Sequence, residues 1–130
     1  MKKKIVKYKS FEEVPVWQTA HESVLKIYFI TKKFPREEIY GLTSQIRRSA
    51  ASIPANIAEG FYRNTTKELI KFLYNARGSC GETMYHLILA RDLKYISLSK
   101  FKSLYPIYND IAKQLNNWIN SLKRKLMTDD

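Results

Sequence analysis

Apolar residues recur along this chain at alternating intervals of three and four residues, in four successive segments separated by short stretches of turn-forming residues. This spacing places each set of apolar side chains on one side of an α-helix. Glycine and proline number only four each, too few for a protein built from many strands and turns. The pattern therefore predicts an all-α protein.

Proline residues delimit the first two helices. Pro15 suits the first turn of a helix, where its missing N–H would be unpaired in any case. Phe34-Pro35 ends that helix. Glu37 and Glu38 then place negative charge at the start of a second helix, predicted over about residues 38–61. The expected core faces are Trp17, Ala20, Val24, Ile27, Thr31 and Phe34 in the first helix, and Leu42, Ile46, Ala50, Ile53 and Ile57 in the second.

Capping residues mark the other two helices. Thr65 and Glu68 have the spacing of a capping box and predict the start of a third helix, which should end around residue 95. Ser97 and Ser99 offer caps for a fourth. The expected core faces are Leu69, Leu73, Ala76, Cys80, Thr83, Leu87 and Ala90 in the third helix, and Leu104, Tyr108, Ile111, Leu115, Trp118 and Leu122 in the fourth.

Short connections make such long helices fold back on their neighbours. The sequence therefore predicts a single antiparallel up-down-up-down four-helix bundle over residues 11–127, preceded by a basic tail at residues 1–10. The single cysteine cannot form an internal disulfide, no apolar run is long enough to cross a bilayer, and no apolar signal core follows the first lysines. A cytoplasmic location without membrane contact is the resulting expectation.

The chain is strongly basic: 23 lysines and arginines against 12 acidic residues give a formal net charge of +11. Such an excess favours polyanionic partners such as RNA or DNA. Lysines at both ends of the chain supply much of it, and for those runs solubility is the alternative interpretation. Candidate nucleic-acid contacts around the second and third helices are Arg47, Arg48, Arg63, Lys67 and Lys71.

No catalytic pattern is present in the sequence. Acidic residues are scattered singly or stand in first helical turns, and no glycine-rich phosphate loop follows a strand. His21 beside Glu22, and His86 four residues after Glu82, have the spacing of ordinary helix-surface pairs. Cys80 lies among small residues on an apolar face, which indicates a buried and inert thiol. We therefore expect no catalytic residue, metal site or cofactor, and no enzyme.

The segment 44–61, SQIRRSAASIPANIAEGF, departs from an ordinary exposed helix. Its polar residues form one stripe on a helical wheel, with Arg48 beside it. Short serine and asparagine side chains lose little entropy when ordered, so the stripe is predicted to face protein, as a clamp between helices or subunits. Direct contact with nucleic acid or another ligand is the alternative. The stripe consists of Gln45, Ser49, Ser52, Asn56, Glu59 and Arg63, among which an ionic network along Arg48, Asn56, Glu59 and Arg63 is sterically available.

Helix-breaking residues in the second and third helices suggest close packing there. Pro54 removes one backbone hydrogen bond and lies among alanines. Gly78 and Gly81 each cost roughly 1 kcal/mol relative to alanine inside a helix. A close crossing of the two helices would explain all three residues.

Three long segments, VPVWQTA, FPREEIYGLTSQIRRSAASIPANIAEG and KELIKFLYNARGSCGE, closely resemble the four-helix-bundle proteins encoded by intervening sequences within bacterial 23S ribosomal RNA genes. The resemblance covers roughly residues 11–125. Where the family usually has Arg-Ala after the first arginine of the second helix, this chain has Ser49 in place of the alanine, which enlarges the polar stripe.

That family is similar to the accessory variability protein of diversity-generating retroelements, a basic pentameric bundle that works with a reverse transcriptase. The resemblance implies a ring-like homopentamer with a positive surface, associated with nucleic acid and with a nucleic-acid enzyme as a partner. A second hypothesis is a structural adaptor that recruits another protein through aromatic and small residues, with the charge serving solubility.

Overall fold

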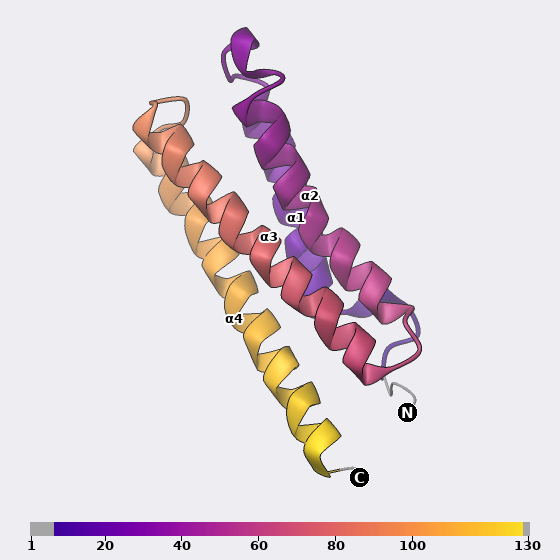
Figure 1. Cartoon of the computed structure of the whole chain (residues 1–130). Coiled ribbons are helices and arrows are strands. Elements are labelled where there is room, and N and C mark those ends of the chain that lie inside the picture. The colour runs from indigo at the N-terminus through magenta and orange to yellow at the C-terminus, as the bar shows by residue number, and fades with distance from the viewer. Residues whose placement is uncertain (1–6, 129–130) are drawn as a thin grey trace.

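The computed structural model describes residues 7–128 and contains four long α-helices and two short 3-10 helices in that range. The helices run alternately up and down, so that α1 begins and α4 ends at the same end of the bundle, the lower end in Figure 1. The predicted all-α four-helix bundle is confirmed. Lys2, Lys3 and Lys4 of the basic tail lie outside the described residues. The elements are η1 (Phe11–Glu13), α1 (Pro15–Thr31), η2 (Arg36–Glu38), α2 (Leu42–Phe61), α3 (Thr66–Asp92) and α4 (Leu98–Thr128).

One continuous apolar core joins the four helices. Every residue predicted for the core faces of α2 and α3 is buried. On α1 and α4 the prediction is wrong at one position each: Trp17 and Trp118 are only partly buried, whereas their neighbours Val16 and Ile119 are buried. A tryptophan is large and carries a polar N–H, so the edge of the core suits it better than the centre.

The start of α3 has the predicted capping box, whereas its end comes earlier than predicted. At its start, the Thr65 hydroxyl accepts a hydrogen bond from the Glu68 backbone N–H (3.2 Å) and donates one to the Glu68 carboxylate (3.0 Å). At its end, α3 stops at Asp92, earlier than predicted, and Lys94 adopts a left-handed backbone conformation with φ of 64°. Ser97 then caps α4 by accepting a hydrogen bond from the Lys100 N–H (3.0 Å).

The second helix begins at Leu42 and not at Glu38 as predicted. Residues 36–38 form the 3-10 helix η2 instead, and the Glu38 carboxylate turns back to accept hydrogen bonds from the Leu42 N–H (3.0 Å) and the Tyr95 hydroxyl (2.9 Å). These two bonds hold the pKa of Glu38 below its usual value. The arrangement requires Gly41, because a Cβ there would lie 2.6 Å from Glu38 Oε1.

The glycine that permits close approach of α2 and α3 is Gly60. A Cβ at this position would lie 3.0 Å from both Leu69 Cδ1 and Phe72 Cβ. The prediction of a packing role within the chain for Gly78 and Gly81 is wrong: both are exposed, and a Cβ on either would meet no other group of the described chain within 4 Å. The packing of α2 on α3 is therefore tightest at the lower end of the bundle.

We predict that Thr65→Ala lowers the free energy of unfolding by about 1 kcal/mol, because the substitution removes the side-chain acceptor for the Glu68 N–H at the start of α3. Thr66→Ala is the matched control: Thr66 is the first residue of α3, and its substitution should leave stability nearly unchanged. Urea denaturation followed by circular dichroism measures both. Equal stability of the two variants would contradict the capping role.

Candidate nucleic-acid interface

The middle of the polar stripe on α2 faces α3, as predicted. Ser49 Oγ accepts a hydrogen bond from the Thr83 hydroxyl (2.9 Å), and Ser52 Oγ lies 2.9 Å from Ser79 Oγ. Asn56 donates its side-chain amide to the Ser52 carbonyl (2.8 Å) and hydroxyl (2.9 Å). These bonds fix the position of α2 along α3, and they keep the small polar residues at the centre of the contact satisfied.

His86 belongs to this cluster and is not the surface residue that its sequence spacing suggested. Its side chain is 9% exposed, and its Nδ1 lies 3.3 Å from Ser49 Oγ. Its Nε2 lies 3.9 Å from Glu82 Oε2 at the edge of the contact. Burial lowers the pKa of His86 below its usual value of 6.5; Glu82 opposes this shift and the charge of Arg48 adds to it. Ser49 and His86 line none of the three main pockets of the described residues, and their contact joins α2 to α3.

The two ends of the stripe point to solvent in the described chain, so they do not clamp α2 to α3, and a contact between subunits stays a prediction there. Gln45 is exposed and accepts a hydrogen bond from Arg48 (2.6 Å), while Glu59 is exposed and pairs with Arg63 (2.8 Å). The continuous ionic network does not form, because Asn56 bonds to Ser52 of its own helix. At the ends of a helix contact, long charged side chains can extend until their charged groups reach water. At its centre there is room only for short polar side chains.

The five candidate cations fall into two groups. Arg48 lies thirteen residues before Phe61, the last residue of α2 and two before Arg63, a separation of about 20 Å at the helical rise, and Arg47 lies one residue further away. Arg47 contacts α1: its Nε donates to Thr31 Oγ1 (2.8 Å), and its guanidinium stands 4.7 Å from the Tyr28 ring centroid. It therefore acts as a tether between α1 and α2.

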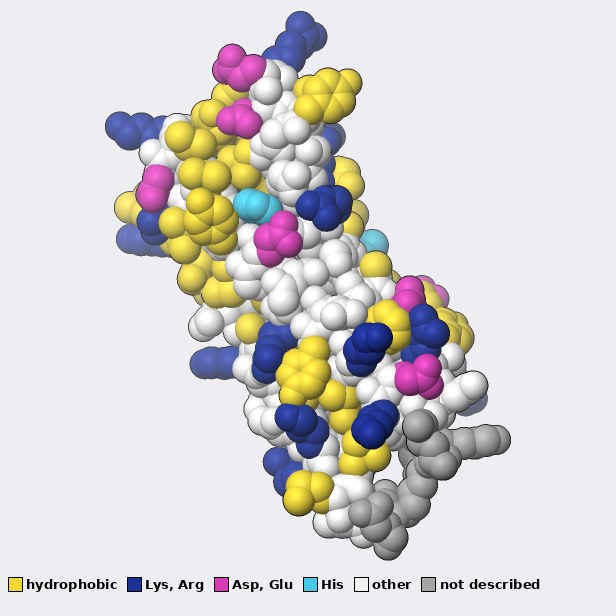
Figure 2. Space-filling view, in the orientation of Figure 1, with side chains coloured by type: hydrophobic (Ala, Val, Ile, Leu, Met, Phe, Trp, Pro, Cys, Tyr) yellow, Lys and Arg dark blue, Asp and Glu magenta, His cyan; other side chains and the backbone are white. Residues whose placement is uncertain are grey.

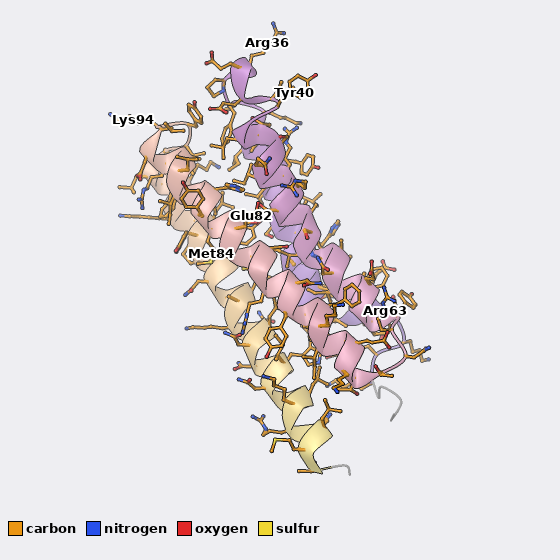
Figure 3. All side chains as sticks on the ribbon, in the orientation of Figure 1. Arg36, Tyr40, Arg63, Glu82, Met84 and Lys94 are labelled. Carbon is orange, nitrogen blue, oxygen red and sulfur yellow. The ribbon has the colours of Figure 1, made fainter. Side chains whose placement is uncertain are left out.

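Arg63, Lys67 and Lys71 lie together at the lower end of the bundle, where α2 passes into α3. Figure 3 labels Arg63 at that end, opposite Arg36 and Tyr40. The Arg63 guanidinium stands 4.6 Å from the Phe72 ring centroid, and both lysines are exposed on α3.

A second cationic cluster lies beside this group, between α3 and α4. The Arg77 guanidinium stands 4.7 Å from the Tyr74 ring centroid and donates to Asn116 Oδ1 of α4 (2.7 Å). Lys123 of α4 approaches the same ring, with its Nζ at 5.3 Å. We call Lys71, Tyr74, Arg77 and Lys123 the basic face. Figure 2 shows dark blue side chains gathered around yellow ones over the lower half of this side of the molecule.

Acidic residues are absent from the helix stretches that build the basic face. Residues 69–81 of α3 and 111–128 of α4 contain six lysines and arginines and no aspartate or glutamate. The sequence pattern did not indicate Tyr74 and Arg77, and it placed Lys123 only in a basic terminus. The absence of acidic residues from 69–81 and 111–128 could have identified these three residues, because an antiparallel bundle places the two stretches side by side.

The described residues contain no group of three or more metal-ligating side chains, and none of their helices is long and apolar enough to cross a membrane. Cys80 is buried, donates to the Tyr108 carbonyl (3.1 Å), and has a pKa that burial raises to about 12. It is thus a thiol and not a thiolate at neutral pH, as the sequence indicated.

The comparisons with known proteins agree with this architecture. The family model of the 23S rRNA-intervening sequence protein matches residues 12–117. The chain belongs to this family. A crystal structure of a protein of unknown function from the S23 ribosomal protein family of Bacteroides thetaiotaomicron is 27% identical, with a TM-score of 0.73, and the alignment covers 80% of this chain and 97% of that one. None of the curated proteins compared with the chain matches it. Neither description of these relatives names a catalytic activity.

We predict that this family member loses stability as the pH falls from about 7 to about 5. The unfolded chain protonates His86 near its usual pKa of 6.5, whereas the folded protein resists protonation until a lower pH, so protons favour the unfolded state in this window. In His86→Gln this part of the pH dependence disappears. His21→Gln, at an exposed histidine stacked on Trp17, should keep it. Urea denaturation at a series of pH values tests both, and identical profiles for the two variants would contradict the prediction.

Proposed function

We propose that this protein acts by binding nucleic acid and not by catalysis, and that the basic face is its contact surface. The observation that carries the proposal is the pairing of cations with a half-buried aromatic ring on two adjacent helix stretches, residues 69–81 of α3 and 111–128 of α4, that lack acidic residues. Lysines and arginines there can neutralise phosphates and release counterions. The half-buried Tyr74 ring contacts Arg77 and Lys123 and so holds both cations at this surface.

Binding of this kind depends on charge and little on base sequence. The basic face is formed by the sides of α3 and α4, and its lysines and arginine are suited to phosphates, which carry no information on base sequence. We therefore expect an affinity that falls steeply with salt and varies little between sequences. A cytoplasmic location, where such a partner is accessible, is part of the same proposal.

Reversing two charges on the basic face tests the proposal. Lys71→Glu with Lys123→Glu should weaken binding of RNA or DNA at low salt about tenfold or more, and should reduce the salt slope by roughly one unit per lost contact. The matched control is Lys26→Glu with Lys33→Glu, which makes the same change in net charge at exposed positions outside the basic face. A mobility-shift assay at several salt concentrations measures both. If the two double variants bind equally, the basic face is not the site.

We also propose that the chain assembles with copies of itself, as a pentamer, and that a nucleic-acid enzyme is a partner of the assembly. The pentamer and the enzyme partner are what the resemblance implies. The exposed glycines of α3 support self-association, since Gly78 and Gly81 weaken the helix and meet nothing within the described chain. A neighbouring backbone could approach α3 closely at these positions, which lie on the same side of α3 as Tyr74 and Arg77, so a subunit contact there would border the basic face at its upper end.

A leucine at position 81 distinguishes assembly through this surface from a monomer. If copies pack against α3 there, Gly81→Leu should lower the mass measured by light scattering, while the fold itself gains up to about 1 kcal/mol from helix propensity. Asn109→Leu places the same side chain on the exposed surface of α4 and should leave the mass unchanged. An unchanged mass for Gly81→Leu would show that α3 is not an interface.

A structural adaptor that recruits another protein is the second candidate function, and an apolar groove between α1 and α4 favours it. Leu25 and Phe29 of α1 are 58% and 61% exposed, and they border a groove of about 410 Å³ toward Leu104 of α4. An apolar groove of this kind suits a protein partner. Binding through it would persist at high salt, whereas binding through the basic face would not.

A further inference from the structure

A pocket of about 440 Å³ lies on the opposite flank of α4 from the basic face, where the last turns of α4 pass the start of α1. Its volume is within the range of small-molecule sites. It lies at the lower end of the bundle, where α1 begins and α4 ends (Figure 1). Ten residues line it: Lys7, Tyr8, Val14, Pro15, Val16, Gln114, Trp118, Ser121, Leu122 and Lys125.

The charge of this pocket selects an anion. Lys7 and Lys125 come from opposite ends of the chain and both line the pocket, and no lining residue is acidic. The Lys7 ammonium lies 5.3 Å from the Tyr8 ring centroid, so its positive charge is held beside an aromatic wall. A ligand that enters here meets two cations and no opposing carboxylate.

The walls of the pocket select a flat apolar ring. Trp118 is only partly buried, because Ile119 occupies the core position next to it, and part of its indole is left to line the pocket. Val14, Val16 and Leu122 are buried and form the apolar floor. Tyr8 and Trp118 are the two aromatic side chains among the lining residues, and aromatic rings stack on any nucleobase.

Polar groups in the same wall suit the edge of such a ring. The Gln114 amide nitrogen donates to Asp110 Oδ2 (2.7 Å), an arrangement that keeps the Gln114 carbonyl oxygen as an acceptor. Ser121 adds a hydroxyl that both donates and accepts. A purely apolar anion, such as a fatty acid, would leave these polar groups without partners.

We propose that this pocket binds one unpaired nucleotide, with the base against Trp118 and Tyr8 and the phosphate at Lys7 and Lys125. This inference rests on the proposed function and extends it, because it specifies single-stranded nucleic acid. The same chemistry could come from a free mononucleotide, and the experiment separates the two sources.

A row of cations at the end of α4 lies between the pocket and the basic face. Lys123 and Lys125 are two residues apart and so project about 200° from one another around the helix. Lys123 lies at the Tyr74 ring of α3, and Lys125 lines the pocket next to α1. Arg124, exposed between them, continues the row of cations. A strand held by the basic face can therefore cross α4 and place one base in the pocket.

Tryptophan fluorescence tests the proposal directly, since the chain has two tryptophans. Trp17→Phe leaves Trp118 as the reporter in the pocket, and Trp118→Phe leaves Trp17, which packs on Phe11 and His21, as the matched control. Each variant is titrated at low salt with an oligothymidylate of about ten nucleotides, a typical length for such sites, with a duplex of the same length, and with adenosine monophosphate. We expect the single strand to quench Trp118 and leave Trp17 unchanged.

Affinity measurements complete the test. Trp118→Ala should weaken binding of the single strand about tenfold and leave duplex binding unchanged, because stacking is lost while the basic face remains. Quenching of Trp118 by the mononucleotide as strongly as by the strand would support the pocket and assign it to free nucleotides. Binding of strand and duplex without any change in Trp118 fluorescence would overturn the pocket and leave the proposed function standing. No binding of any nucleic acid would overturn the proposed function, and the mononucleotide arm would then decide the pocket alone.

Discussion

The packing of α2 against α3 is the contact on which the rest of this molecule depends. At the lower end, the missing side chain of Gly60 lets Leu69 and Phe72 approach the backbone of α2. Further up, Ser52 meets Ser79 and Ser49 meets Thr83 across the same contact. Short side chains bring the two helices close, and a helix pair this close has little room for solvent or for long charged groups. The hydrogen bonds between small hydroxyls then set its register.

The α2–α3 contact determines which surfaces of the bundle carry the lysines and arginines. The buried polar residues at the centre of the α2–α3 contact are Ser49, Thr83 and His86, and none of them has a long charged side chain. The arginines on and next to α2 lie at the margins of this contact. Arg47 turns to α1, Arg48 to Gln45, and Arg63 to Glu59 and Phe72. The outer sides of α3 and α4 have no such restriction. Their acid-free stretches meet side by side because the bundle is antiparallel, and the result is one concentrated cationic surface.

The parts of the fold that depend on local sequence could be predicted. Apolar spacing identified the four helices, Pro15 the start of α1, and the Thr65 capping box the start of α3, since each of these is decided by neighbours within one or two helical turns. The start of α2 could not be predicted in this way. It depends on a hydrogen bond between Glu38 and Tyr95, which are 57 positions apart in the chain. Likewise, a choice between Trp118 and Ile119 for the core depends on the shape of the space between helices.

The candidate site was harder to predict than the fold for a related reason. The sequence pointed to cations close together on α2 and α3, but consecutive residues of one helix project about 100° apart, and Arg47 turns to α1 whereas Arg48 turns to Gln45 of its own helix. The basic face instead combines Tyr74 and Arg77 of α3 with Lys123 of α4, and the bond from Arg77 to Asn116 fixes their alignment. What makes this surface distinctive is not the number of its charges. Arg77 and Lys123 are held against an aromatic ring, so they stay beside that ring and are less able to spread into solvent.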